Sequence, residues 1–372
     1  MNIADNLELI RSSKDAIRNA ITRKGVLTGS NMSTYADNIM QIGRGIYPSL
    51  PDLSTIAIQD DVMCFTVSPH TYWGMLIGLD TGTYTVESGT IVDGAYVASN
   101  TDSSSAYTNG TNYYCINNTD SYVVYRLTCT SHIKMLSVKL DATKGTQGLV
   151  EMYGAMPYVA SMNFASCAAL QTCTIKSRLQ LITSLYGCFQ NCSALTSIDT
   201  SSWTLDNCIS LSGCFNNCSS LTSIDTSRWT LDKCTNMSSC FYNCSALTSL
   251  DATSWLLSAT VSFSQTLQNL NSLTSLMNLN FQNIISMDSF SCPKLINFRF
   301  LNYGARGDYK TNITLGSQVV KADIIQFFGD LYDRATAGYS VLTIAITQAA
   351  SKYTAAEVAV ATAKGYTITF NG

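Results

Sequence analysis

Residues 185–262 read LYGCFQNCSALTSIDTSSWTLDNCIS, LSGCFNNCSSLTSIDTSRWTLDKCTN and MSSCFYNCSALTSLDATSWLLSATVS, three consecutive copies of one 26-residue unit. A fixed period of this size indicates a solenoid, because so short a unit buries its apolar side only by stacking on its neighbours. The repeated columns that we expect to form the core of the stack are Cys188, Phe189, Cys192, Leu195, Trp203, Cys214, Phe215, Cys218, Leu221, Trp229, Cys240, Phe241, Cys244, Leu247 and Trp255.

Weaker copies of the unit extend the array on both sides. The matching positions are Phe164, Cys167 and Leu170 upstream and Leu267, Leu270, Leu273, Cys292 and Leu295 downstream. We therefore expect about six coils within residues 151–305, with atypical coils at both ends as caps.

The best-preserved part of the unit carries a resemblance to a known family. Residues 235–251, TNMSSCFYNCSALTSLD, resemble the BspA-type leucine-rich repeat, in which NMS-x-MF-x-x-C-x-x-L-x-x-L-D recurs. Cys188, Cys214 and Cys240 stand where the family has a second Met. The resemblance implies a leucine-rich-repeat solenoid that displays a binding surface.

The C-terminal residues 306–372 are expected to form an α/β cap. Thr354 and Glu357 have the spacing of an N-terminal capping box, and Lys364 with Gly365 is a helix stop. The ending AEVAVATAKGYTITF is similar to the IAIATNKGWT close of repeat proteins encoded by gut Bacteroidetes and their phages.

The N-terminal residues 1–45 are expected to form a coiled-coil-like helix that anchors and oligomerises the chain. The residues of its heptad seam are Ile3, Leu7, Ile10, Lys14, Ile17 and Ile21. We expect self-association, as a homotrimer first and a dimer second; an amphipathic helix packing on its own chain is the alternative. The pieces KGV and YAD-x-I-x-x-I also resemble a leader of phage tail and fibre proteins, which implies contacts with other virion proteins.

Residues 46–150 are predicted to form an antiparallel β-sandwich or jelly roll. Apolar and polar residues alternate in VMCFTV at 62–67, TYTVE at 83–87, SYVVYRLTCT at 121–130 and MLSVKL at 135–140. The whole chain is therefore expected to be of mixed α+β class. Whether the sandwich binds a sugar does not follow from its fold.

Composition excludes some classes of partner. The chain has 372 residues, a net charge of -3 and only 13% charged residues. It therefore lacks the excess of positive charge that nucleic-acid binding requires. No apolar run approaches the roughly 20 residues of a membrane helix. The charged N-terminus is unlike a signal peptide, so we expect synthesis in the cytoplasm and no membrane partner.

The 14 cysteines allow three interpretations. Disulfides and zinc are possible in principle, but the pairs such as Cys188 and Cys192 lack histidine or a second CxxC. We prefer small apolar thiols stacked in the core.

Three other repeated columns each allow more than one interpretation. The carboxylates Asp199, Asp225 and Asp251 are expected to close turns, with a calcium ladder as the alternative. The tryptophans are expected in the core, with a sugar-stacking stripe as the alternative. Asn191, Asn217 and Asn243 begin glycosylation sequons, as do Asn109, Asn117, Asn236 and Asn312, but we expect the repeated Asn to bond backbone at a turn.

No catalytic motif is present, so we expect no enzyme, no cofactor and no metal site. The two histidines, His70 and His132, do not belong to a recognisable Ser-His-Asp or Cys-His catalytic motif. The carboxylates Asp60, Asp61 and Asp80 leave a virion-associated glycan hydrolase as a minor alternative.

The sequence thus predicts a structural component of a bacteriophage virion, a head or tail fibre or appendage that displays its repeats to a host surface protein, a glycan or other subunits. The alternative is a BspA-like adhesin on a bacterial cell surface. An adhesin is exported and needs a secretion signal, whereas a virion protein assembles in the host cytoplasm.

Overall fold

The structure is a computed structural model, and contacts divide the chain into two units, residues 1–50 and 51–372. The residues that the structure describes are 62–68, 71–79, 83–92, 95–101, 107–108, 112–117, 122–129, 132–138, 148–287, 292–305 and 313–371, together with Leu53, Ile56 and Asp60. The predicted helix and heptad seam within residues 1–45 lie outside them.

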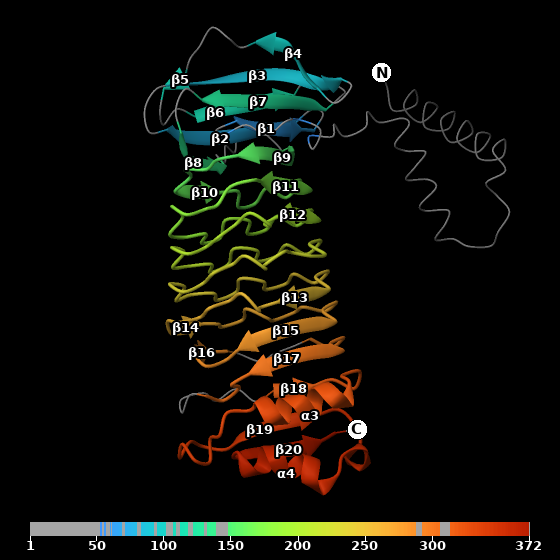
Figure 1. The fold of residues 1–372 in the computed structure, drawn as a ribbon. Helices are drawn as coiled ribbons and strands as arrows, with labels where there is room; N and C mark the ends of the chain where they lie inside the picture. Colours follow the sequence, from blue (N-terminus) through green and yellow to red (C-terminus); the bar gives the residue numbers. More distant parts are fainter. Residues whose placement is uncertain are drawn as a thin grey trace, which may run out of the picture. The chain divides into compact units, whose positions relative to one another are not determined.

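The described chain is mostly β, and its main feature is a β-solenoid of stacked coils (Figure 1). Within the described residues there are two α-helices, α3 (Lys321–Asp330) and α4 (Ala355–Ala363), and a short 3-10 helix, Ala350–Lys352. The predicted solenoid is therefore confirmed.

Two sheets precede the solenoid. The first is antiparallel and has the order β9 (Leu149–Ala155), β1 (Val62–Val67), β7 (Val123–Cys129), β3 (Thr83–Val92), β4 (Ala95–Thr101), with β5 (Tyr107–Thr108) also paired to β3. The second has the order β10 (Ser161–Asn163), β8 (Ile133–Val138), β2 (Thr71–Leu79), β6 (Asn112–Asn117). Phe65 and Leu127 of the first sheet and Ile77 and Leu136 of the second are fully buried in one core.

The first sheet runs directly into the solenoid. Strand β9 pairs in parallel with β11 (Thr172–Ile175), which pairs in parallel with β12 (Ser197–Asp199). Because the antiparallel strands β1 and β9 also pair, one continuous ladder joins the N-terminal strands to the coils. The first coil of the stack is therefore covered by a sheet and has no open edge on that side.

Backbone hydrogen bonds between coils hold the solenoid together. The N–H of Phe189 donates to the carbonyl of Cys214 at 2.8 Å, and Phe215 repeats this bond to Cys240 at 2.9 Å. Further on, β13 (Ser249–Asp251), β15 (Ser275–Asn280) and β17 (Asn297–Leu301) form a parallel sheet, and β14 (Val261–Ser262) pairs with β16 (Ile284–Ser286). The coils thus follow one another in chain order (Figure 1).

The stack ends in a βα unit. Strands β18 (Ile313–Leu315), β19 (Leu342–Ile346) and β20 (Tyr366–Phe370) form a parallel sheet in this order. Helix α4 has the predicted capping box between Thr354 and Glu357, and Gly365 follows it at a φ of +85°. Only a residue that tolerates this left-handed backbone can stand there, which explains the glycine.

Candidate functional site

The candidate site is built on a rigid core made of the predicted repeat columns. All fifteen of these residues are buried; Trp255 is 4% exposed and the others are 0% exposed. Each apolar column packs against its own copy in the next coil, so Phe189 and Phe215 are parallel, with ring centroids 5.6 Å apart. Side chains on the outer surface are therefore held at a fixed spacing from coil to coil.

The cysteines of this core are protonated and shielded from solvent. The cysteines of the coils are free thiols. The Sγ–H groups of Cys192, Cys218 and Cys244 donate to a phenylalanine carbonyl of the preceding coil at 3.2, 3.2 and 3.1 Å. Burial raises the pKa of Cys192 and of Cys244 to about 12. Since the thiolate is the nucleophile and the metal ligand, these groups are chemically inert in the folded protein.

The repeated aspartates close turns. Oδ1 of Asp199, Asp225 and Asp251 accepts the backbone N–H of the residue two positions later, at 3.0, 2.9 and 2.9 Å. Partial burial raises the pKa of Asp199, but hydrogen bonds from Lys176 and Ser201 outweigh it and hold the pKa below its usual value. Within the described residues no group of three or more His, Cys, Asp or Glu is arranged to hold a metal ion.

The three repeated tryptophans, Trp203, Trp229 and Trp255, lie in the core and present no ring to a sugar. Trp203 Nε1 donates to the carbonyl of Ile175 at 3.1 Å. The Nε1 groups of Trp229 and Trp255 are buried without a hydrogen-bond partner among the described residues. The first ring is thus anchored by a polar contact that the next two lack.

The repeated asparagines form a ladder along the stack. Asn217 Nδ2 donates to Asn191 Oδ1 and Asn243 Nδ2 donates to Asn217 Oδ1, each at 2.8 Å, and Asn269 Nδ2 continues the row to Asn243 Oδ1 at 2.6 Å. These side chains therefore bond one another and not the backbone, contrary to our expectation. The backbone explains the residue type, because φ is +62° at Asn191, +61° at Asn217 and +59° at Asn243, a region that Asn tolerates better than other residues with a Cβ.

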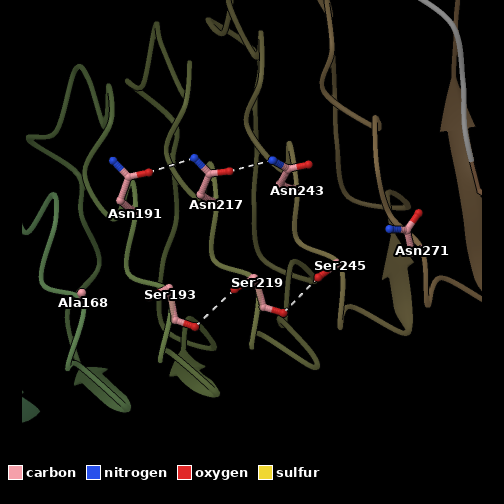
Figure 2. Close-up of a pocket in the computed structure, with 8 residues that line it drawn as sticks. All are labelled: Ala168, Asn191, Ser193, Asn217, Ser219, Asn243, Ser245 and Asn271. Atoms are coloured by element: carbon pink, nitrogen blue, oxygen red, sulfur yellow. Dashed lines mark hydrogen bonds between the residues drawn. The ribbon is translucent and has the colours of Figure 1, made fainter.

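A row of serines runs beside the asparagine ladder. Ser219 Oγ donates to the carbonyl of Ser193 at 3.5 Å, and Ser245 Oγ donates to the carbonyl of Ser219 at 3.3 Å. Figure 2 shows the two rows side by side across successive coils. They border an open groove of about 630 Å³, lined by Ala168, Asn191, Ser193, Asn217, Ser219, Asn243, Ser245 and Asn271.

The groove offers neutral hydrogen-bonding groups only. Its lining contains amides, hydroxyls and one alanine, and no charged side chain. Asn217 and Asn243 each use one N–H and the side-chain oxygen along the row, which leaves the second N–H for another acceptor. Such a surface suits a neutral polar ligand better than an ion.

Sequence reasoning singled out Asn191, Asn217 and Asn243 but missed the serines and Asn271. The signal was present, since Ser193, Ser219 and Ser245 occupy one column of the repeat. Periodicity alone does not show that this column of serines lines the same groove as the asparagines.

Of the residues considered for hydrolysis, the structure describes Asp60 and His132. Asp60 is exposed and bridges to Ala155, whereas His132 packs against the ring of Tyr158 with centroids 3.7 Å apart. The other candidates, Asp61, His70 and Asp80, lie outside the described residues, as do Asn109 and Asn312. No helix in the described part of the chain is long and apolar enough to span a bilayer.

Comparison with known proteins identifies the solenoid region alone. A family model described as "Mycoplasma protein of unknown function, DUF285" matches residues 161–294, from β10 to just before β17. No curated protein and no solved structure matches the chain. The stacked coils are thus similar to a domain found in other proteins.

Proposed function

We propose that this protein is a structural component of a bacteriophage virion, a head or tail fibre or appendage that displays its solenoid surface to the host or to neighbouring subunits. The observation that carries the proposal is the uncharged groove between the asparagine and serine rows, held on a core whose columns repeat from coil to coil. A rigid scaffold with a regular outer surface suits recognition, because little conformational entropy is lost on binding.

Other features support the virion assignment. The leader within residues 1–45 and the close AEVAVATAKGYTITF both resemble segments of phage-encoded repeat proteins. A helical N-terminal segment would join copies of the chain and attach them to other virion proteins, and a β-sandwich within residues 46–150 would link that anchor to the coils. The BspA-type assignment of the repeats belongs to the same proposal.

The partner would be a host surface protein or glycan. Amides and hydroxyls hydrogen-bond neutral polar groups such as sugar hydroxyls. Trp203, Trp229 and Trp255 are buried in the coils, so recognition at the groove would depend on hydrogen bonds and shape, with none of these three rings available for stacking.

A bacterial surface adhesin is the second candidate. The observation that favours it is the match of residues 161–294 to a family whose description names Mycoplasma, a cellular organism. The first function places the solenoid on a virion, and the second places it on a bacterial cell surface.

Peptide mass spectrometry of density-purified phage particles separates them. We expect peptides of this chain at a constant ratio to the major capsid protein, because a structural component occupies a fixed number of symmetry-related positions. An abundant host cytosolic protein serves as the contamination control. Recovery of the peptides only from the host envelope would contradict the virion function and favour the adhesin.

A further inference from the structure

The last strand of the stack has one paired edge and one open edge. Strand β20 pairs with β19 along its length, from Tyr366 opposite Leu342 to Phe370 opposite Ile346, without a bulge. In the sheet order β18-β19-β20 it is the outer strand, and no strand of the described chain pairs with its other side. The N–H and C=O groups on that side are therefore available to another strand.

Strand β20 has no charge, proline or bulge of its own to block edge pairing. Its sequence, YTITF, contains no charged residue and no proline. Natural proteins blunt exposed edges with lysine, proline or bulges because an open edge is a template for association. Thr367 is exposed and Thr369 half-buried, and strand alternation puts both on the same face of the sheet.

The helix beside this edge presents an uncharged surface as well. The charged residues of α4 and its C-cap are used within the chain: Glu357 pairs with Lys321 at 3.1 Å, and Lys364 Nζ donates to the carbonyl of Gly329 at 2.6 Å. The exposed residues of the helix are all Ala, Val or Thr, namely Ala355, Ala356, Ala359, Val360, Thr362 and Ala363. Small side chains allow a second helix to approach closely, since the spacing of packed helices depends on the side chains at their contact.

We propose that a second copy of this chain binds at this end, by two-fold antiparallel pairing of β20 with β20. A two-fold contact brings the same patch of both copies together, so the patch has to be self-complementary. With the axis at Ile368, Thr367 of each copy faces Thr369 of the other, and Tyr366 faces Phe370. Cross-strand threonine pairs are favourable, and no charge becomes buried.

An open strand edge specifies its occupant chemically, because only an extended backbone satisfies its alternating donors and acceptors. The second copy supplies such a strand in matching register, and its own α4 brings an equally uncharged face. This end-to-end contact is separate from self-association through residues 1–45 and from the identity of the particle.

The test uses two double variants of the full chain that change the same two positions. Thr367→Lys with Thr369→Lys places lysine opposite lysine across both symmetry-related pairs. Thr367→Lys with Thr369→Glu places lysine opposite glutamate in both pairs. Like charges directly opposite one another destabilise a strand pair, whereas opposite charges stabilise it.

Molar mass by light scattering over a concentration series gives the result. We expect the wild type and the Lys/Glu variant to have a larger molar mass than the Lys/Lys variant at each concentration, because the pairing adds a contact to whatever association residues 1–45 contribute. Equal masses for wild type and Lys/Lys would overturn the pairing. A Lys/Glu variant with the Lys/Lys mass would also overturn it and would point to a strand of another protein.

Circular dichroism of each variant checks folding before a mass is compared. If the Lys/Lys variant does not fold, Thr369→Lys alone replaces it and is expected to lower the fraction of paired chains at each concentration. Particle composition does not enter this measurement, so failure of the pairing and failure of the virion function are distinguishable.

Discussion

The regular coils and the C-terminal end of the stack pack their aromatic rings in opposite ways. In the coils, Phe215 lies parallel to Phe189 and Phe241, with interplanar angles of 0° and 5°. At the end, Phe327 of α3 meets Phe298 at 71° and Phe300 at 89°. A repeated coil places each ring over its own copy and can only stack it, whereas residues that do not repeat can interlock edge to face.

This difference shows how a repeat is terminated. Because each coil repeats the shape of the one before it, every coil can pack against a further coil, and the array ends only where the pattern changes. Buried Arg334 marks the change: its Nη1 donates to the carbonyl of Gly304 at 2.6 Å and its Nε to that of Ser340 at 2.8 Å. Such unrepeated contacts distinguish the end from the regular coils within one continuous core, and the following predictions test how independently the two regions unfold.

The largest expected effect comes from removing one ring in each region. Phe215→Ala and Phe327→Ala should each cost about 3–5 kcal/mol locally, because both side chains are buried. In a solenoid, stability is a sum over neighbouring units. Phe215→Ala should therefore weaken the middle of the array, and Phe327→Ala should loosen only its end.

Urea denaturation followed by two signals separates these effects. In a Trp73→Phe background, all remaining tryptophans lie in the regular coils, while helical ellipticity reports on α3, on α4 and on the helix expected within residues 1–45, which neither substitution changes. Phe215→Ala should lower the fluorescence midpoint, and Phe327→Ala should lower only the ellipticity midpoint. Coincident shifts of both signals in both variants would show that the two regions unfold as one unit.

An intermediate effect is expected in the asparagine ladder. Asn217 has a φ of +61° and bonds a ladder neighbour on each side. Asn217→Gly should cost about 1 kcal/mol for the lost side-chain bonds. Asn217→Ala should cost about 2 kcal/mol, since alanine also strains the left-handed backbone.

The matched control lies at the end of the stack. Asn302 has a φ of +55° and one side-chain bond, to Asn280 at 3.1 Å. Asn302→Gly should therefore cost less than Asn217→Gly in the same urea experiment. An equal or larger cost at Asn302 would mean that the ladder adds nothing to the regular coils.

The smallest expected effect lies inside the regular coils. Trp203 Nε1 has a carbonyl acceptor, and Trp229 Nε1 has none among the described residues. Both rings are fully buried, so replacement by Phe removes a similar apolar volume. Trp203→Phe should be more destabilising than Trp229→Phe by about 1 kcal/mol, as judged by the urea midpoint of ellipticity. The reverse order would show that the bond to Ile175 contributes nothing.

Periodicity was a reliable guide to local structure. The 26-residue period predicts the coils, and the Thr354 and Glu357 pair predicts the start of α4. Alternation predicts β1, β3, β7 and β8, all of which are present. It did not identify β2, TYWGMLIGL, because a nearly continuous apolar run has no period of two.

The sequence indicated one of the two residue rows that form the candidate site, the asparagines, and did not indicate the serines. The asparagine column attracted attention as a sequon, but its hydrogen bonds go to the same residue in adjacent coils, about 26 positions away. The serine column gave no chemical signal of its own. Neither the ladder nor the groove could be derived without knowing which columns share a surface.

The sequence by itself determined the repeat, the residues that fill its core and the helix that helps to close it, because these follow from short-range spacing and side-chain character. Only the tertiary structure decided that two polar columns border one groove and that β20 is left with an open edge. The physical reason is that a period specifies how units follow one another along the chain. Which groups lie together on the outside depends on contacts between residues far apart in sequence.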